Sequence, residues 1–301
     1  MFDPLLHGLS RRHFLAGSGA TVGAVLLGAC GGGGDDKVGA TDTTASKKDD
    51  VVLAQYFGGP LFAAGVPLRA PFGIADSEGI LPITSTPEEL EVTIVGPDGK
   101  TVGDPLTLQR HAKGLQRAYF PLVVTLPDAG IYSVRADLGG SAPAEMALQV
   151  DAAADLMVIQ PGAALPALDT PTVADPRGVT PICTADPVCP LHDVTAAEAL
   201  AEGKPLALLV ATPAFCQVTI CGPVLDVLLG ALGDHPEVRG LHAEVYANPS
   251  AGLDAYAPTV AALGLHLEPC LVLVGSDGKV AERWDAIYDA DELDAALSSL
   301  T

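Results

Sequence analysis

Short apolar runs, separated by turn-forming residues, dominate the chain from residue 51 to residue 152. The runs are rich in β-branched and aromatic residues, which is typical of strands. The predicted strands cover residues 51–55, 68–72, 90–95, 106–109, 119–126, 131–136 and 146–150. The sequence Gly-Pro-Asp-Gly at residues 96–99 predicts a turn, because proline fixes φ and glycine accepts a positive φ. We therefore expect a β-sandwich domain over residues 51–152.

The pattern changes after residues 153–180, a stretch rich in proline and alanine that predicts a linker. From residue 181 to residue 301, predicted strands alternate with predicted helices. The strands cover residues 206–211, 241–246, 271–274 and 280–284, and the helices residues 195–202, 224–232, 257–263 and 291–300. Thr195 and Glu198 have the spacing of a capping box. The continuous apolar run 206–211 is typical of a strand buried on both faces, so we expect an α/β domain over residues 181–301.

The first 30 residues have the pattern of an export signal. Arg11 and Arg12 precede a weakly apolar run that glycines interrupt, and the run ends in Leu-Gly-Ala-Cys at residues 27–30. The paired arginines resemble a twin-arginine signal, and the ending resembles the lipobox of bacterial lipoproteins. This resemblance implies cleavage before Cys30, a lipid on its sulfur, and a protein anchored on the outer face of a membrane. Residues 31–50, rich in glycine and charged residues, predict a flexible tether.

Composition and charge narrow the classes of partner. The formal net charge is -21, which argues against nucleic acid or anionic lipid as a partner. Apolar residues make up 49% of the chain, enough for large hydrophobic cores. No second apolar run of about 18 residues follows the signal, so we expect no transmembrane helix. The glycines at residues 31–34 are not a phosphate loop, because no Lys-Ser or Lys-Thr pair follows them, and we expect no cofactor.

The segment from Asp128 to Tyr132 reads Asp-Ala-Gly-Ile-Tyr and resembles the tyrosine corner of immunoglobulin-like sandwiches. The resemblance implies a hydrogen bond between the Tyr132 hydroxyl and the backbone a few residues upstream. Val134 stands where that family usually has a cysteine. We therefore expect an immunoglobulin-like sandwich that lacks the usual disulfide and has no catalytic cluster.

The order of elements in residues 181–301, together with three local features, resembles the thioredoxin fold. Cys216 follows Phe215 between a buried strand and a helix, as the aromatic-cysteine pair of thioredoxins does. Pro269 precedes the strand 271–274, as does the cis-proline that faces the active cysteine in that family. The hairpin turn at residues 276–279 and the last helix complete the match. The resemblance implies that Cys216 is a nucleophile and that Pro269 shapes a substrate groove beside it.

The second cysteine of the expected dithiol, Cys221, lies five residues after Cys216, whereas thioredoxins carry Cys-x-x-Cys. Five residues along an intact helix separate Cα atoms by roughly 8.6 Å and place them on opposed faces. A disulfide needs Cα atoms within about 7 Å. The helix must therefore begin later or unwind its first turn on oxidation. Gly222 and Pro223 favour a later start, because proline is well tolerated where a helix begins.

We expect thiol–disulfide exchange with protein thiols or disulfides as the function. The thiolate of Cys216, stabilised at a helix N-terminus, attacks, and Cys221 then resolves the mixed disulfide. Glu268 and Cys270 flank Pro269 in the sequence. They are candidate auxiliary residues, Glu268 as a proton acceptor and Cys270 as a third thiol.

Two alternatives remain open from the sequence. Cys216 and Cys221 can form a static disulfide in a non-catalytic lipoprotein whose α/β domain binds a partner or a metal. Their spacing also resembles that of the bacterioferritin-comigratory peroxiredoxins, whose peroxide-reacting and resolving cysteines lie five residues apart. Thr212 and Pro213 are similar to that family's Thr-Pro, but Thr212 lies four residues before Cys216 instead of three. We therefore rank a peroxidase below disulfide exchange.

Cys183 and Cys189 lie in a proline-rich loop that continues to His192. The main expectation is a disulfide that staples this loop, since disulfides form and persist outside the cytosol. An alternative adds His192 and binds copper or zinc, because thiolate and imidazole suit soft metals. Two cysteines and one histidine are too few for a closed zinc site, so we expect no metal.

Overall fold

The computed structural model of the protein describes residues 51–217 and 219–300. The predicted signal at residues 1–30, the lipidation site Cys30 and the tether at residues 31–50 lie outside the described residues. Among the described residues, no helix is long and apolar enough to cross a membrane. This part of the chain is mostly β-sheet, with several sheets and few helices.

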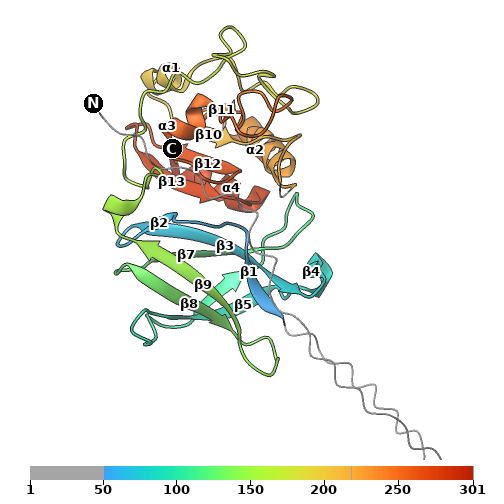
Figure 1. The fold of residues 1–301 in the computed structure, drawn as a ribbon, viewed down its shortest axis with the longest axis vertical. Coiled ribbons are helices and arrows are strands. Elements are labelled where there is room, and N and C mark those ends of the chain that lie inside the picture. The colour runs from blue at the N-terminus through green and yellow to red at the C-terminus, as the bar shows by residue number, and fades with distance from the viewer. Residues whose placement is uncertain (1–50, 218, 301) are drawn as a thin grey trace, which may run out of the picture. The chain divides into compact units, whose positions relative to one another are not determined.

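Two sheets form a sandwich in the first half of the described chain (Figure 1). In the first sheet, β3 (Pro67–Asp76) pairs antiparallel with β1 (Val52–Gln55), β4 (Gly79–Ile80) and β7 (Phe120–Thr125). The second sheet has the order β2-β9-β8-β5-β6. Its strands are β2 (Phe62–Ala63), β5 (Glu89–Val95), β6 (Leu106–Gln109), β8 (Gly130–Ala136) and β9 (Ala144–Asp151). Every strand predicted here is present, and the prediction missed only β2 and β4, which are too short to carry a pattern.

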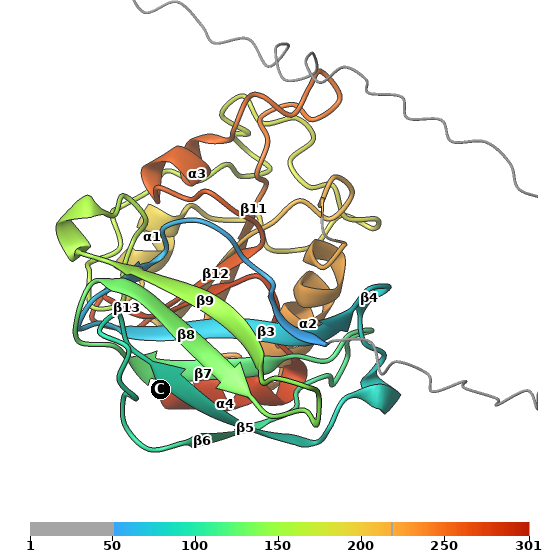
Figure 2. The ribbon, with the colours of Figure 1, turned by 60° about the horizontal axis from the view of Figure 1, so that its bottom comes forward.

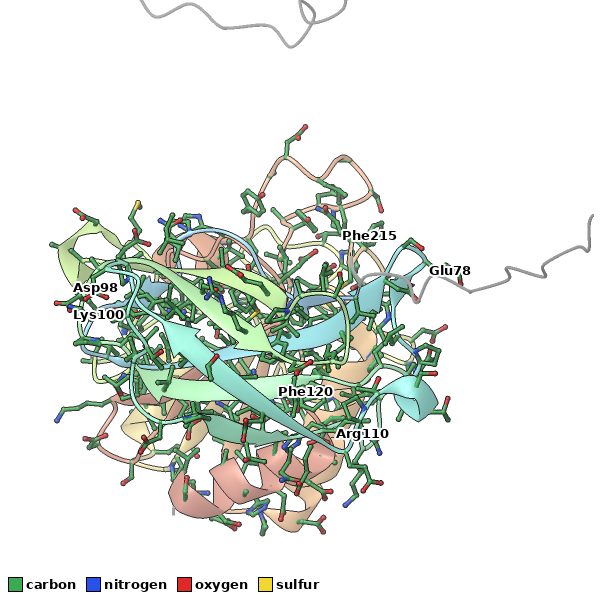
Figure 3. All side chains as sticks on the ribbon, turned by 90° about the horizontal axis from the view of Figure 1, so that it is seen from below. Glu78, Asp98, Lys100, Arg110, Phe120 and Phe215 are labelled. Atoms are coloured by element: carbon green, nitrogen blue, oxygen red, sulfur yellow. The ribbon has the colours of Figure 1, made fainter. Side chains whose placement is uncertain are left out.

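Alternation along the strands builds the core of the sandwich. Strand β9 buries Ala144, Met146, Leu148 and Val150 and exposes the residues between them, because successive side chains of a strand point to opposite faces. Figure 2 shows β8 and β9 side by side and crossing over β3 and β7. Phe120 of β7 is fully buried and lies in the middle of the sandwich (Figure 3). Side chains of both sheets therefore share one hydrophobic core.

Two predicted turns of the sandwich are confirmed. The Tyr132 hydroxyl donates to the Asp128 carbonyl at 2.9 Å, which is the backbone contact expected of a tyrosine corner. The turn at residues 96–99 closes with a hydrogen bond from the Gly99 N–H to the Gly96 carbonyl at 2.9 Å. Asp98 and Lys100 lie together at the rim of the sandwich (Figure 3) and form an exposed ion pair. The tyrosine corner and the turn at residues 96–99 therefore define where the adjoining strands end.

One mixed sheet with helices forms the second half of the described chain (Figure 1). Its strands are β10 (Leu206–Val210), β11 (Arg239–Ala243), β12 (Cys270–Val274) and β13 (Val280–Asp285), in the order β11-β10-β12-β13. The helices are α1 (Ala196–Ala201), α2 (Cys221–Asp234), α3 (Pro258–Ala262) and α4 (Ala290–Leu300), and two 3₁₀ turns occur earlier, η1 (Ile83–Ser85) and η2 (Ala153–Asp155). β10 is parallel to β11 and antiparallel to β12. Thr195 and Glu198 form the predicted capping box before α1.

The central strands of this sheet are buried on both faces, as predicted for the run 206–211. Leu206 and Leu208 contribute to the core that includes the sandwich, whereas Ala207 and Leu209 pack on the side of α2 and α4. The strand predicted at residues 241–246 begins and ends earlier. Its pairing with β10 runs only from Arg239 to Ala243. The residues after Ala243 leave the sheet, although Val245 and Tyr246 are apolar.

A buried ion-pair network joins the sandwich to α4. Arg69 of β3 donates to the two carboxylate oxygens of Glu292 at 2.6 and 2.7 Å and to the Ile287 carbonyl at 2.7 Å. The Tyr119 hydroxyl also bonds Glu292, and the guanidinium lies 4.7 Å from the centroid of the Trp284 ring. Only 5% of Arg69 is exposed. The buried, desolvated guanidinium of Arg69 therefore connects the two halves of the described chain.

Residues of the predicted linker, 153–180, lie along β13. The Gly162 N–H donates to the Val280 carbonyl at 2.8 Å, and the Leu165 N–H donates to the Gly278 carbonyl at 2.9 Å. These backbone bonds cover an edge of the sheet that is otherwise left without a partner strand. The division of the chain at residues 152 and 180 stays a prediction.

Candidate functional site

The start of α2 determines where the two cysteines of the expected dithiol lie. Cys216 follows β10 in a loop, and α2 begins at Cys221. The prediction of a later helix start is thus confirmed. Pro223 is the third helical residue and still belongs to the first turn, where backbone N–H groups have no partner within the helix. Within the loop, Thr219 adopts a φ of 59°, a left-handed conformation that is uncommon for a β-branched residue.

The loop and the helix start bring three reactive side chains together. The sulfurs of Cys216 and Cys221 and a carboxylate oxygen of Glu268 all lie within 4.8 Å of one another. Cys216 is half-buried and Cys221 is fully buried. The backbone N–H of Cys221 donates to the Cys216 sulfur at 3.4 Å. The outer sulfur is therefore accessible and lies at the positive end of α2, which favours its thiolate.

The inner thiol is held in the protonated form. A hydrogen bond from Cys221 to the Cys216 sulfur raises the pKa of Cys221, and burial raises it further. A thiol that donates to its neighbour must keep its proton, while the neighbour gains a partner for its negative charge. The arrangement thus assigns the charge to Cys216 and the proton to Cys221.

Glu268 supplies an acid–base group beside the two sulfurs. Burial raises the pKa of this carboxyl to about 7, and the charge of Cys216 adds to the shift. Neither carboxylate oxygen has a hydrogen bond of normal geometry within the described residues. The Glu268–Pro269 peptide bond is cis, as the resemblance implied. A buried base that titrates near neutral pH can accept the proton of Cys221.

Replacing Glu268 by glutamine is expected to slow resolution of the mixed disulfide by roughly 100-fold at pH 7.5. In the wild type, this step should speed up as pH rises through the pKa of Glu268, which burial holds above its ordinary value of 4.5. Glu268→Gln should lose that inflection. The decay of the mixed disulfide, followed by acid quenching and alkylation, measures the step. Glu145→Gln, an exposed change in the sandwich, is the matched control. Equal pH profiles for wild type and Glu268→Gln would contradict the assignment.

The same substitution should raise stability at high pH. Between its ordinary value of 4.5 and about 7, the folded state holds a proton on Glu268 that the unfolded state has lost, so stability falls as pH rises through this window. Glutamine removes that loss. After allowance for solvent screening, we expect Glu268→Gln to gain about 1 kcal/mol at pH 8. The gain should vanish at pH 4, as thermal unfolding at the two pH values can show.

A cavity of about 390 Å³ opens beside this cluster. Gln217 and Glu268 form its wall on the side of the cysteines, and Tyr56 and Phe57 contribute from the sandwich. Further lining residues are apolar or aromatic: Val245, Tyr246, Tyr256, Val260 and Leu265. Phe215, which directly precedes Cys216, is labelled in Figure 3. Apolar and aromatic walls with a few polar groups are typical of a ligand-binding cavity.

The candidate Cys270 and the nearby His266 have surroundings that differ from those of Glu268. Cys270 is fully buried, and burial raises the pKa of its thiol well above the ordinary value. A thiol that stays neutral and buried is a poor nucleophile, so its role as a third redox partner stays a prediction that the geometry does not favour. His266 is exposed and lines the cavity.

The loop cysteines form a second cluster with two histidines. The sulfurs of Cys183 and Cys189 lie 3.8 Å apart and are not bonded. Both His192 and His242 point ring nitrogens toward these sulfurs. The predicted disulfide stays a prediction. Sequence reasoning missed His242, which lies on β11, 50 residues after His192. The His242 N–H donates to the Leu191 carbonyl at 3.0 Å, and this bond joins β11 to the loop.

Comparison with known proteins does not assign a family. No family model matches the chain, and no curated protein matches it. Among solved structures, a chain from the titin M10–obscurin-like 1 Ig complex is similar at 17% sequence identity with a TM-score of 0.19. The match covers 30% of this chain and 81% of that chain. The residues of the chain itself therefore carry the functional interpretation.

Proposed function

We propose that the protein is a thiol–disulfide oxidoreductase that acts outside the cytosol through Cys216 and Cys221. The observation that carries this proposal is the cluster of two sulfurs and the Glu268 carboxylate at the start of α2. The proposal includes a thioredoxin-like domain at residues 181–301 and an immunoglobulin-like sandwich at residues 51–152. The proposal also includes a twin-arginine signal at residues 1–30 and a membrane anchor through a lipid on Cys30.

The reaction begins at the accessible sulfur. The Cys216 thiolate attacks one sulfur of a substrate disulfide, forms a mixed disulfide and releases the other substrate sulfur as a thiolate. Cys221 then gives its proton to the Glu268 carboxylate and attacks the Cys216 sulfur. The second substrate thiolate leaves and is protonated. The net result is a reduced substrate and a Cys216–Cys221 disulfide, and the reverse sequence oxidises a substrate dithiol.

Four features of the described residues support this sequence of steps. Cys216 is the more exposed sulfur, so a large substrate reaches it first. Cys221 is buried behind it, where it can reach the Cys216 sulfur after the mixed disulfide has formed. Cys216 precedes α2, which begins only at Cys221, so the two sulfurs can approach without unwinding the helix. The cavity beside Gln217 and Glu268 offers a surface for the substrate.

Trapping of the intermediate tests the proposal. Cys221→Ser can still attack through Cys216 but cannot resolve, so we expect it to accumulate a mixed disulfide with an oxidised protein substrate. The wild type should release the substrate, and Cys216→Ser should trap none. Mass spectrometry of alkylated peptides identifies the linked cysteine. No adduct in Cys221→Ser, or an adduct on another cysteine, would contradict the proposal; Cys216-dependent consumption of peroxide would favour a peroxidase.

A further inference from the structure

We propose that Cys183, Cys189, His192 and His242 form a closed, tetrahedral zinc site that is separate from the Cys216–Cys221 pair. All four side chains are buried, and their ligand atoms lie within 4.8 Å of one another. The set is Cys₂His₂, one of the usual structural zinc combinations. Three ligands come from the loop before α1, and the fourth comes from β11.

The distances between ligand atoms match a zinc tetrahedron. Zinc–sulfur bonds of about 2.3 Å and zinc–nitrogen bonds of about 2.05 Å at tetrahedral angles give edges of about 3.8 Å between sulfurs and about 3.5 Å between sulfur and nitrogen. The two sulfurs lie 3.8 Å apart. His192 Nε2 lies 3.2 Å from the Cys189 sulfur, and His242 Nδ1 lies 3.4 Å from Cys189 and 3.7 Å from Cys183. A cation of this size therefore fits between the four atoms.

A hydrogen bond behind His242 orients this ligand toward the centre. His242 Nε2 lies 3.1 Å from the Ala211 carbonyl, and a carbonyl can only accept, so Nε2 carries the proton. The lone pair of His242 Nδ1 therefore faces the two sulfurs. Metal-bound histidines usually hold their other nitrogen in this way. The residue after Cys183 is also fixed, because the Thr184 N–H donates to Glu244 Oε1 at 2.6 Å.

Charge balance explains why such a cluster can be buried. Two thiolates and two neutral imidazoles carry a charge of about −2, which one Zn²⁺ cancels. A disulfide between Cys183 and Cys189 would also remove the charge, but it would bring the sulfurs to about 2.05 Å. It would also leave the ring nitrogens of His192 and His242 without a role. The convergence of four donors favours the metal.

The site fastens a loop that has no regular secondary structure. Residues 181–192 contain no helix or strand within the described chain, and zinc would tie them to β11. The same loop contacts the segment that presents Cys216, since the Ala214 N–H donates to the Thr184 hydroxyl at 3.2 Å. The zinc thus has a structural role, because it holds the loop that contacts the segment carrying Cys216.

Metal analysis of the full chain, purified under reducing conditions, tests the proposal. We expect about one zinc per chain in the wild type. His242→Ala should lose most of it, whereas His266→Ala, an exposed histidine, should keep it. The Cys216→Ser/Cys221→Ser double variant should also keep it, which separates this site from the dithiol cluster. Zinc lost from the double variant and kept in His242→Ala would overturn the proposal.

A second measurement does not depend on a folded variant. Removing the metal from wild-type protein with a chelator should lower the thermal midpoint, and adding Zn²⁺ should restore it. Co²⁺ in place of zinc should give the visible absorption of a tetrahedral cobalt–thiolate centre. A Cys183–Cys189 disulfide in non-reducing peptide maps of freshly purified protein, with no zinc bound, would overturn the proposal. Copper bound in place of zinc would also overturn it.

Discussion

Replacing Cys216 by serine is expected to lower the rate of insulin reduction by at least about 10³-fold, to the level of uncatalysed exchange. Serine is nearly the same size, but its hydroxyl does not ionise near neutral pH and forms no disulfide. The change therefore removes the attacking group and leaves its surroundings intact. Turbidity of insulin with dithiothreitol as the electron donor measures the rate. A Cys216→Ser protein that retains more than a tenth of the wild-type rate would contradict the mechanism.

Cys270→Ala provides the matched control for loss of a thiol. Its sulfur is fully buried, and its thiol pKa is raised by burial. Alanine is small and apolar, so the substitution should fold and keep at least half of the wild-type rate. If Cys270→Ala loses activity as completely as Cys216→Ser, Cys270 is the third redox partner that the sequence suggested.

Replacing Arg69 by methionine is expected to destabilise the protein by about 3–5 kcal/mol. The substitution leaves the Glu292 carboxylate without its charged partner. The side chain of Glu292 is only 13% exposed, so water cannot replace that partner. It also removes the hydrogen bond to Ile287 and the contact with the Trp284 ring. Urea unfolding at pH 7 measures the loss. A loss below about 1 kcal/mol would show that the pair behaves like a surface ion pair.

The double variant Arg69→Met/Glu292→Leu distinguishes loss of the pair from loss of packing. Replacing both charges with apolar groups of similar size avoids an unpaired buried charge, and such replacements are often close to neutral. We therefore expect the double variant to recover most of the stability lost in Arg69→Met. A double variant that is less stable than Arg69→Met would mean that the network stabilises through its full set of hydrogen bonds, including those of Tyr119.

Local pattern was sufficient to predict most elements of this fold. Alternation and turn residues predicted the long strands of the sandwich, because each strand buries one face and its pattern shows in the sequence. A start of α2 after Cys216 could be predicted from two facts together: the disulfide distance limit and the positions of Gly222 and Pro223. The observed start at Cys221 lies three residues before the predicted one at residue 224. The two-residue strands β2 and β4 could not be predicted, since they exist only through pairing with β9 and β3.

Contacts between segments that lie far apart in the chain could not be predicted from the sequence. Glu268 was a candidate because it precedes Pro269, but its raised pKa comes from burial, which depends on the packed fold. His242 had no signal of its own, because a single histidine in an apolar strand is commonly a core residue. The Arg69–Glu292 pair spans 223 positions. Such residues meet only after the sheets are assembled, so no local pattern marks them.

The reduction potential of the Cys216–Cys221 pair tests the central claim most directly. The protein would be equilibrated in dithiothreitol or glutathione redox buffers, trapped by alkylation, and analysed by peptide mass spectrometry. An exchange-active pair should have a midpoint between about −300 and −120 mV, the range of thioredoxin-like oxidoreductases. A midpoint below about −300 mV would identify a static structural bridge and contradict the proposed function.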